Sequence, residues 1–290
     1  MMIYPMKPKY PIYIISKGRP KCVTAKHLKQ LNVPFYIVVE PHQLNDYKKE
    51  NPTCNFLTTP FKNLNKASIP VRNWVWDHSI NNKFEKHWVL DDNINGFYRL
   101  NKNTKYKVLS SGFFRAMEDF TDRFSNVGLS GPNYFGFCKK YDKLPPFYSN
   151  TRIYSCILVN NNLPFRWRGL FNEDTDLSLR TLKNNMCTIL FNAFLCDKAT
   201  TLRMAGGNTD EIYKNTNKRF EFASSLQNQH PDVVKVTKKF NRFHHHVNYK
   251  PFKNIKLIKK SNVSYPTNII NEYNMTLKHS SQINLSLYNL

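Results

Sequence analysis

The residues best able to bind an ion or a phosphate are Asp91 and Asp92, which follow a short apolar segment. His87-Trp88-Val89-Leu90 precedes the pair and Asn93 follows it. A strand that ends in two adjacent carboxylates presents the hard oxygen ligands that Mg²⁺ and Mn²⁺ prefer and share with substrate phosphates. The pattern therefore predicts a divalent metal site. The alternative is that the pair starts a turn, as Asp and Asn often do.

A second acidic group, Glu173, Asp174 and Asp176, lies where a helical pattern begins. Acidic side chains in a first helical turn complement the helix dipole, so the cluster has a partial structural explanation. Three carboxylates within four positions exceed what capping requires. A carboxylate held beside a hydroxyl group can remove its proton during a reaction, so one of the three is a candidate general base.

Three further groups carry weaker signals. Gly206-Gly207-Asn208 indicates either a tight turn whose backbone approaches a ligand or a simple loop. Arg19 and Arg72 are candidates for binding phosphate, or are ordinary surface arginines. The run from His244 to His246 offers an imidazole to a metal, or is a solvated strand or loop.

The elements that must position these residues alternate between strands and helices in the first third of the chain. Their spacing is typical of parallel βαβ units, with strands expected at 12–15, 35–39 and 87–90 and helices at 21–31 and 70–80. Ligands of open α/β sheets bind at the carboxyl ends of strands, which is where Ser16, Glu40 and Asp91 fall.

The rest of the chain continues the α/β pattern. We expect a helix from Ser110 or Ser111 to Phe124, and then strands at 127–130, 153–159 and 188–191 and helices at 173–184 and 210–229. We expect one α/β domain over residues 1–255, followed by a polar C-terminal extension over 256–290.

The chain is strongly basic, because 43 Lys and Arg against 20 Asp and Glu give a formal charge of +23. This charge would attract a polyanion such as nucleic acid, although a lysine-rich composition is also typical of an AT-rich genome. No apolar run has the length of a membrane span or a signal-peptide core, which predicts a soluble cytoplasmic protein with no membrane partner. The six cysteines form no CxxC pair and are expected to be reduced.

The candidate segments also occur in a recognisable order. Residues 11–19, 70–74, 87–93, 172–177 and 206–209 together resemble the TET/JBP-associated glycosyltransferases, a family that includes phage enzymes and the glucosyltransferase that makes base J. The resemblance spans about residues 11–249. The order of the segments is more specific than any one of them.

The resemblance implies a GT-A fold, that is, a Rossmann-like nucleotide-diphospho-sugar transferase with a mixed central sheet. It implies transfer of a sugar, typically glucose from UDP-glucose, to the hydroxymethyl group of a modified pyrimidine in DNA, either 5-hydroxymethylcytosine or 5-hydroxymethyluracil. The expected cofactor is Mn²⁺ or Mg²⁺, the donor is a UDP-sugar, and the partner is DNA that contains hydroxymethylated pyrimidines. The setting would be the cytoplasm of a phage-infected bacterial cell.

The resemblance also implies residue roles. Asp174 would be the base, supported by Glu173 and Asp176, and Glu40 would contact uracil. The metal would be bound by Asp92, Asp91 and His245, with Asp91 also near the ribose. The remaining donor-binding candidates are Ser16, Arg19, Arg72, Gly206, Gly207 and Asn208. Asn93 departs from the usual Asp-x-Asp pattern at its third position.

Two alternatives remain at this stage. The same catalytic domain could act on a protein hydroxyl, which the high positive charge disfavours. A catalytically silent nucleic-acid-binding module that retains the fold is disfavoured by the intact carboxylates.

Overall fold

The computed structural model describes residues 6–64, 66–139, 144–199, 216–239, 242–263 and 268, with side chains from 218 onward in the fourth of these ranges. The predicted glycine turn at Gly206, Gly207 and Asn208 lies outside the described residues. Within this part, no helix is long and apolar enough to cross a membrane. The six cysteines are all described, and they form no disulfide.

The first half of the chain builds a parallel sheet in the strand order β3-β2-β1-β4. Its strands are β1 (Ile12–Ile15), β2 (Tyr36–Val39), β3 (Asn55–Thr58) and β4 (Lys86–Asp91). The helices between them are α1 (Val23–Gln30), α2 (Leu44–Glu50) and α3 (Ile69–Asn81). Strands buried on both faces read as continuous apolar runs, which is why β1, β2 and β4 were visible in the sequence and the more exposed β3 was not predicted.

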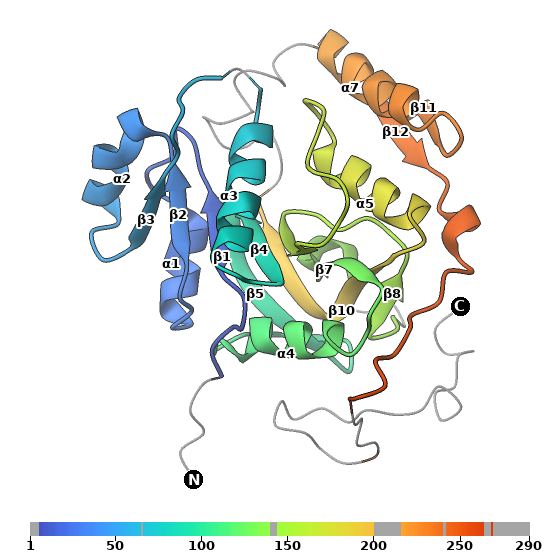
Figure 1. Cartoon of the computed structure of the whole chain (residues 1–290), viewed down its shortest axis with the longest axis horizontal. Coiled ribbons are helices and arrows are strands. Elements are labelled where there is room, and N and C mark those ends of the chain that lie inside the picture. Colours follow the sequence, from blue (N-terminus) through green and yellow to red (C-terminus); the bar gives the residue numbers. More distant parts are fainter. Residues whose placement is uncertain are drawn as a thin grey trace.

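The sheet continues past β4 through strands of mixed direction, in the order β9-β7-β10-β5-β6, and β8 pairs with β10 (Figure 1). These strands are β5 (Ile94–Asn101), β6 (Thr104–Lys107), β7 (Val127–Tyr134), β8 (Phe147–Ser149), β9 (Cys156–Asn160) and β10 (Cys187–Lys198). Because β4 and β7 both pair antiparallel with β9, they run in the same direction, and β10 runs parallel to β7. The predicted α/β class with a mixed central sheet is confirmed.

This topology places the ends of several strands at one side of the sheet, here called the carboxyl edge. Strands β1, β2, β4, β7 and β10 all end there, and β9 begins there, because Leu90 of β4 pairs with Cys156 of β9. Residues far apart in the sequence therefore meet at this edge.

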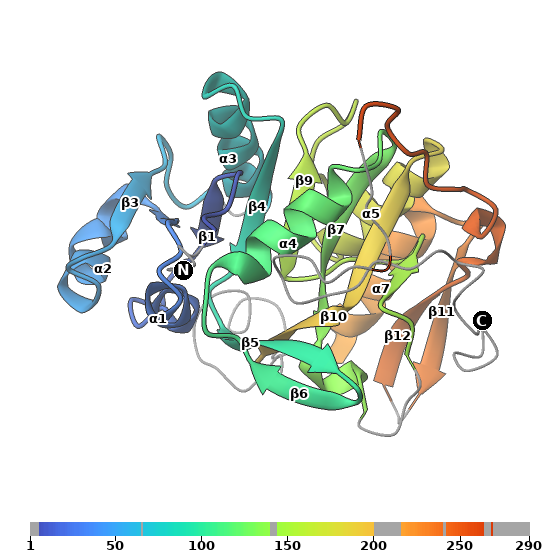
Figure 2. The same cartoon turned by 90° about the horizontal axis from the view of Figure 1, so that it is seen from below.

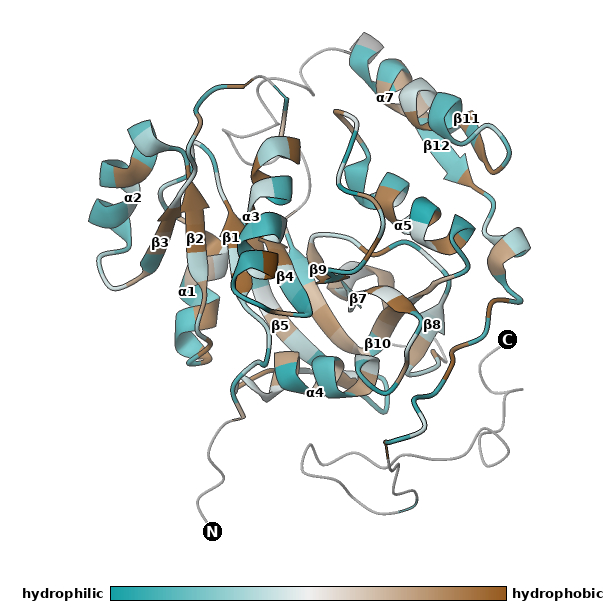
Figure 3. Ribbon diagram, viewed as in Figure 1, coloured by the Kyte–Doolittle hydropathy of each residue, from teal (hydrophilic) through white to brown (hydrophobic). Residues whose placement is uncertain are grey.

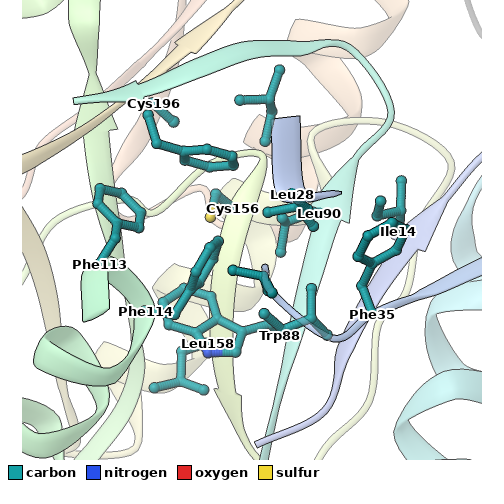
Figure 4. Packing of buried hydrophobic residues seen from close by; sticks show 14 of the residues in the cluster. Ile14, Leu28, Phe35, Trp88, Leu90, Phe113, Phe114, Cys156, Leu158 and Cys196 are labelled. Carbon is teal, nitrogen blue, oxygen red and sulfur yellow. The ribbon is translucent and has the colours of Figure 1, made fainter. Parts of the chain in front are cut away.

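Helices cover both faces of the sheet, as the period-two alternation of strand side chains requires. On one face, α1 and α4 (Gly112–Thr121) pack on Ile14, Trp88 and Leu90. Figure 4 shows this cluster, in which the rings of Trp88 and Phe114 lie 5.2 Å apart. On the other face lie α3 and α5 (Glu173–Lys183). Figure 3 shows the largely hydrophobic strands between these helices.

A smaller unit, α7 (Thr216–Gln229) with the two-stranded sheet of β11 (Val234–Lys239) and β12 (Arg242–Val247), lies beside α5 (Figures 1 and 2). Leu226 of α7 and Val234 of β11 pack against Leu179 and Leu182 of α5. Helix α5 therefore supports this unit.

Most of the expected elements are present within one or two residues of the predicted bounds. Four differ more. Helix α4 ends at Thr121, the strand expected from 153 begins only at Cys156, the strand expected to end at 130 extends to Tyr134, and β10 extends to Lys198. Ser155 explains the second difference, because its φ of 58° interrupts an extended strand. Residues 210–215 of the last predicted helix lie outside the described residues.

Candidate active site

Five side chains from four elements form a charged cluster at the carboxyl edge. They are Arg72 of α3, Asp91 of β4, Glu173 and Asp174 of α5, and Lys198 of β10. Arg72 is almost completely buried and lies within 3.4–3.6 Å of all three carboxylates, while its guanidinium stacks on the Trp167 ring at 4.7 Å. The sequence predicted four of these five residues as site residues, and the structure brings those four together.

Lys198 is the member of the cluster that sequence reasoning missed. Its ammonium lies 2.5 Å from Oδ2 of Asp91. The available signal was the length of the strand, because an extension of the predicted 188–191 segment by seven residues places a lysine at the carboxyl edge.

Ser155 connects the two acidic parts of the cluster. Its hydroxyl donates to Oδ2 of Asp91 at 2.7 Å, and its backbone N–H donates to Oδ2 of Asp174 at 3.4 Å. The left-handed backbone at φ 58° is costly for a serine, and such strain is concentrated at functional sites. The hydroxyl of Tyr134 completes the contact at 2.7 Å from the Ser155 hydroxyl.

The cluster shifts the pKa values of its two central carboxylates, Asp91 and Asp174, in opposite directions. Burial acts to raise the pKa of Asp91, but Lys198 and Arg72 lower it overall, so Asp91 is ionised at neutral pH. Burial raises the pKa of Asp174 to about 7, with Arg72 acting in the opposite direction. A carboxyl with a pKa near the working pH is suited to accept a proton during a reaction.

Two polar atoms of the cluster face each other without a hydrogen-bond partner among the described residues. They are Nη1 of Arg72 and Oδ1 of Asp174, which lie 3.6 Å apart and are buried. A buried polar atom without a partner costs about 1–3 kcal/mol. A hydroxyl oxygen that reached both atoms would donate its proton to Asp174 and accept a hydrogen bond from Arg72.

Asp92 points to a different group of residues, here called the loop cluster. Its carboxylate accepts a hydrogen bond from Ser16 at 2.6 Å and pairs with Arg19 at 3.0 Å, and Tyr47 contacts both Ser16 and the Arg19 backbone. Burial raises the pKa of Asp92, although Ser16 and Arg19 oppose this effect. Glu40 is held nearby, by Lys17 at 3.3 Å and by the backbone N–H of Asn63.

The predicted metal ligands Asp91, Asp92 and His245 do not converge on one point. Asp91 pairs with Lys198 and Arg72, and Asp92 pairs with Arg19, so each carboxylate already neutralises a cation. Within the described residues, no three His, Cys, Asp or Glu side chains are grouped as ligands of one ion. The side chains as arranged do not fit a divalent metal, and we derive no step through one.

His245 lies instead in the middle of β12, half-buried beside Arg152. Burial, together with the charge of Arg152, lowers the pKa of His245 to about 4. The guanidinium of Arg152 stacks on the ring of Tyr154, whose hydroxyl contacts Thr175 of α5. Among the described residues, His245 forms no hydrogen bond or ion pair with a member of the charged cluster, to which Arg152 and Tyr154 link it.

Asp176 also departs from its predicted role beside Asp174. Its carboxylate is buried and pairs with Arg168 at 3.0 Å, Arg180 at 2.8 Å and His230 at 2.9 Å. The turn of the helix places Asp176 on a different face of α5 from Asp174. We infer from these contacts that Asp176 has a structural role. It links α5 to the segment after α7.

The model of the family described as TET-Associated Glycosyltransferase matches residues 10–207. That segment contains the whole charged cluster and the loop cluster. No curated protein matches the chain.

Two solved structures are similar at low identity. One is a protein described as a nucleotide-diphospho-sugar transferase from Desulfovibrio desulfuricans G20, with 7% identity, coverage of 64% of this chain and 80% of that chain, and a TM-score of 0.39. The other is glucosyl-3-phosphoglycerate synthase from Mycobacterium tuberculosis, in complex with Mg²⁺ and UDP, with 10% identity, coverage of 83% and 88%, and a TM-score of 0.45. These scores are too low to support an argument about the site. The family model covers more than half of the chain, and the chain therefore belongs to the TET-associated glycosyltransferase family.

Proposed function

We propose that this chain is a GT-A glycosyltransferase that moves a sugar, typically glucose, from a UDP-sugar to the hydroxymethyl group of a pyrimidine in DNA. Membership of the TET-associated glycosyltransferase family supports the reaction type. The observation that carries the proposal for the acceptor chemistry is the pair of buried atoms Nη1 of Arg72 and Oδ1 of Asp174, which lie 3.6 Å apart and have no hydrogen-bond partner among the described residues.

An acceptor hydroxyl at this pair is positioned for transfer. As the hydroxyl oxygen forms its bond to the anomeric carbon of the sugar, its proton passes to Asp174. The bond between the anomeric carbon and the diphosphate oxygen breaks, and its electron pair leaves with UDP. A group with a pKa near 7 can accept the proton at neutral pH and release it afterwards.

The departing diphosphate requires positive charge, because negative charge develops on it as the bond breaks. Arg72 and Lys198 supply two cations within the charged cluster. Preorganised charges in a site of low water content stabilise a transition state more strongly than the same charges do in water. We assign them this role.

The loop cluster supports a proposal for the nucleotide. Ser16, Arg19 and Asp92 fix the loop after β1, and Glu40 directly follows β2. In open α/β sheets, nucleotides bind at the carboxyl ends of such strands. We assign the uridine to this loop, with Glu40 near the base and Arg19 near the phosphates.

The DNA acceptor is supported by the charge of +23, since DNA binding depends on neutralising backbone phosphates. Mass spectrometry of nucleosides, after incubation with hydroxymethylated DNA and a panel of UDP-sugars, tests the whole proposal. A mass increase of one hexose on 5-hydroxymethylcytosine or 5-hydroxymethyluracil is the expected result. If the UDP-sugar is consumed but the sugar is found only on protein, or on no macromolecule, the proposal of a DNA acceptor is contradicted.

A further inference from the structure

The two-stranded sheet of β11 and β12, here called the ribbon, has two chemically different faces. Its register pairs Lys235 with His246, Thr237 with His244, and Lys239 with Arg242. These six residues share one face because side chains alternate along a strand and directly opposed residues lie on the same side. We call this the outer face.

The inner face of the ribbon is committed to packing. Val234 is fully buried against Leu226 of α7, and the backbone N–H of Val236 donates to Gln227 of the same helix. Phe243 contacts Phe220 of α7, with ring centroids 5.0 Å apart. The orientation of the ribbon is therefore fixed, and its outer face is the one left to solvent.

The outer face carries positive charge with no compensating acid. Lys235, Lys239, Arg242, His244 and His246 are all exposed, and residues 234–247 include no Asp or Glu. Within the described residues, neither of the two lysines nor Arg242 has an ion-pair partner. The like charges of Lys235, Lys239 and Arg242 repel one another, so they favour an anionic partner.

A chain of contacts links the ribbon to the proposed acceptor site. His245, on its inner face, lies beside Arg152, which stacks on Tyr154 at 5.2 Å. Tyr154 precedes Ser155, whose N–H contacts Asp174. In addition, α5 supports the ribbon unit through Leu179 and Leu182 and carries Asp174 in its first turn. Figure 1 shows β12 and α7 beside α5.

We propose that the outer face of the ribbon, through Lys235, Lys239 and Arg242, binds the phosphate backbone of the acceptor DNA and so holds the duplex beside the active site. Alternate side chains on one strand are about 6.6 Å apart, and each DNA strand carries one phosphate per about 3.4 Å of helix axis. A stripe of this length therefore spans several phosphates. The inference rests on the proposed DNA acceptor, because another acceptor would give the ribbon no reason to bind DNA.

The test compares two triple variants that remove the same number of charges. The ribbon variant is Lys235→Gln, Lys239→Gln and Arg242→Gln. The control variant is Lys29→Gln, Lys48→Gln and Lys49→Gln, which changes exposed lysines of α1 and α2. Thermal unfolding establishes that both fold. Fluorescence anisotropy with a labelled 20-base-pair duplex, over a range of salt concentrations, measures binding.

In the ribbon variant, the slope of log affinity against log salt should become shallower by about 0.9 for each DNA phosphate that the protein no longer neutralises, up to about 2.7. Its KM for hydroxymethylated DNA should rise at least tenfold, while hydrolysis of the UDP-sugar by water stays unchanged. The control variant should keep the wild-type slope to within about 0.9, the effect of a single phosphate. Equal slopes and equal KM values in the two variants overturn the ribbon assignment.

The two proposals fail in different ways. Wild-type protein that binds duplex DNA through the ribbon, but transfers no sugar to hydroxymethylated DNA, contradicts the proposed function and retains the ribbon as a DNA-binding surface. Wild-type protein that glycosylates DNA equally well with and without the ribbon charges contradicts the ribbon alone. Failure of the wild-type chain to bind duplex DNA contradicts both.

Discussion

The ammonium of Lys198 lies 2.5 Å from Oδ2 of Asp91, although 107 residues separate the two in the sequence. Asp91 ends β4 and Lys198 ends β10, and β9 and β7 lie between these strands. Ser155, just before β9, and Tyr134, at the end of β7, are hydrogen-bonded to each other, and Ser155 also donates to Asp91. Four neighbouring strands thus each contribute one polar residue at the carboxyl edge.

This relationship makes Lys198→Met an informative variant. If the ammonium stabilises the departing diphosphate, its removal should lower the turnover number by about 10²–10³-fold, the range typical of removing one preorganised group that stabilises transition-state charge. Single-turnover transfer from a UDP-sugar measures the effect.

Lys86→Met is the matched control. Lys86 is buried and, like Lys198, pairs with an aspartate, Asp122 at 2.9 Å, but it begins β4 at the opposite end of the strand from Asp91. The control should be less stable than the wild type and keep its turnover number. Equal turnover in the folded Lys198→Met and Lys86→Met proteins would exclude a catalytic role for Lys198.

The same pair predicts how the site responds to metal. An ion that binds Asp91 must displace the Lys198 ammonium, so Lys198→Met should bind Mn²⁺ more tightly than the wild type. Isothermal titration of each protein with Mn²⁺, in the absence of nucleotide, measures the difference. Identical affinities would show that Lys198 does not compete for the carboxylate.

The sequence predicted the ends of β1, β2 and β4 well and the contacts between distant residues poorly. Asp91 and Asp92 were correctly placed at the end of a strand, because a buried apolar run followed by polar residues is a local pattern. That pattern does not show which way each side chain points, and the two carboxylates pair with different cations, Lys198 and Arg19. Contacts between residues distant in the chain depend on sheet order, which no local pattern specifies.

Local signals were also missed where the residue types were unusual. The hairpin of β5 and β6 turns at Lys102 and Asn103, both with positive φ, as a two-residue hairpin turn requires. Asn-Gly is the common signal for such a turn, and this chain has few glycines. Asp176 was grouped with Asp174 by proximity in sequence, whereas the helix turns it toward Arg168, Arg180 and His230.

Asp92→Asn should act on nucleotide binding. The substitution removes the charge that pairs with Arg19 and weakens the acceptor of the Ser16 hydrogen bond, so the loop after β1 is no longer anchored. Hydrogen bonds to charged groups contribute about 1.5–3 kcal/mol, which corresponds to a decrease in affinity for UDP of about 10–100-fold if the loop binds the nucleotide. Titration with UDP measures it, and unchanged affinity would remove the loop cluster from the donor site.

Asp176→Ala should act on stability. Removing one partner of a buried ion pair costs about 3–5 kcal/mol, because it leaves buried charge uncompensated. Burial acts to raise the pKa of Asp176, but hydrogen bonds from His230 and Arg168 lower it overall, below the ordinary value of 3.8. The carboxylate therefore contributes stability above that value, and the contribution disappears as the pH falls through its folded pKa.

Chemical unfolding at pH 7 and at pH 3 tests this assignment. The wild type should exceed Asp176→Ala in stability at pH 7, and the difference should shrink at pH 3. Asp232→Ala removes an exposed partner of Lys183 and should cost less than about 1 kcal/mol. A cost for Asp176→Ala no larger than that of Asp232→Ala would argue against a structural role.

Asp174→Asn tests the proposed base. If Asp174 accepts the proton of the acceptor hydroxyl, the variant should lower the rate of the chemical step by about 10²–10⁴-fold and barely change affinity for the UDP-sugar, since the proton moves only during transfer. Because the pKa of Asp174 is raised to about 7, the wild-type rate should rise with pH up to about 7 and then level off. This rise should be absent in Asp174→Asn, which cannot ionise at this position.

Because the pKa of Asp174 is raised from 3.8 to about 7, the wild type loses stability as the pH rises between these two values, and Asp174→Asn should be no less stable than the wild type at pH 8. Single-turnover rates from pH 5.5 to pH 8.5, with Asp77→Asn on α3 as a control for an exposed carboxylate, measure the rate profile. A retaining mechanism needs no such base. Near-normal turnover with an unchanged pH profile in folded Asp174→Asn would therefore withdraw the assignment and direct attention to Glu173, which contacts the same Arg72.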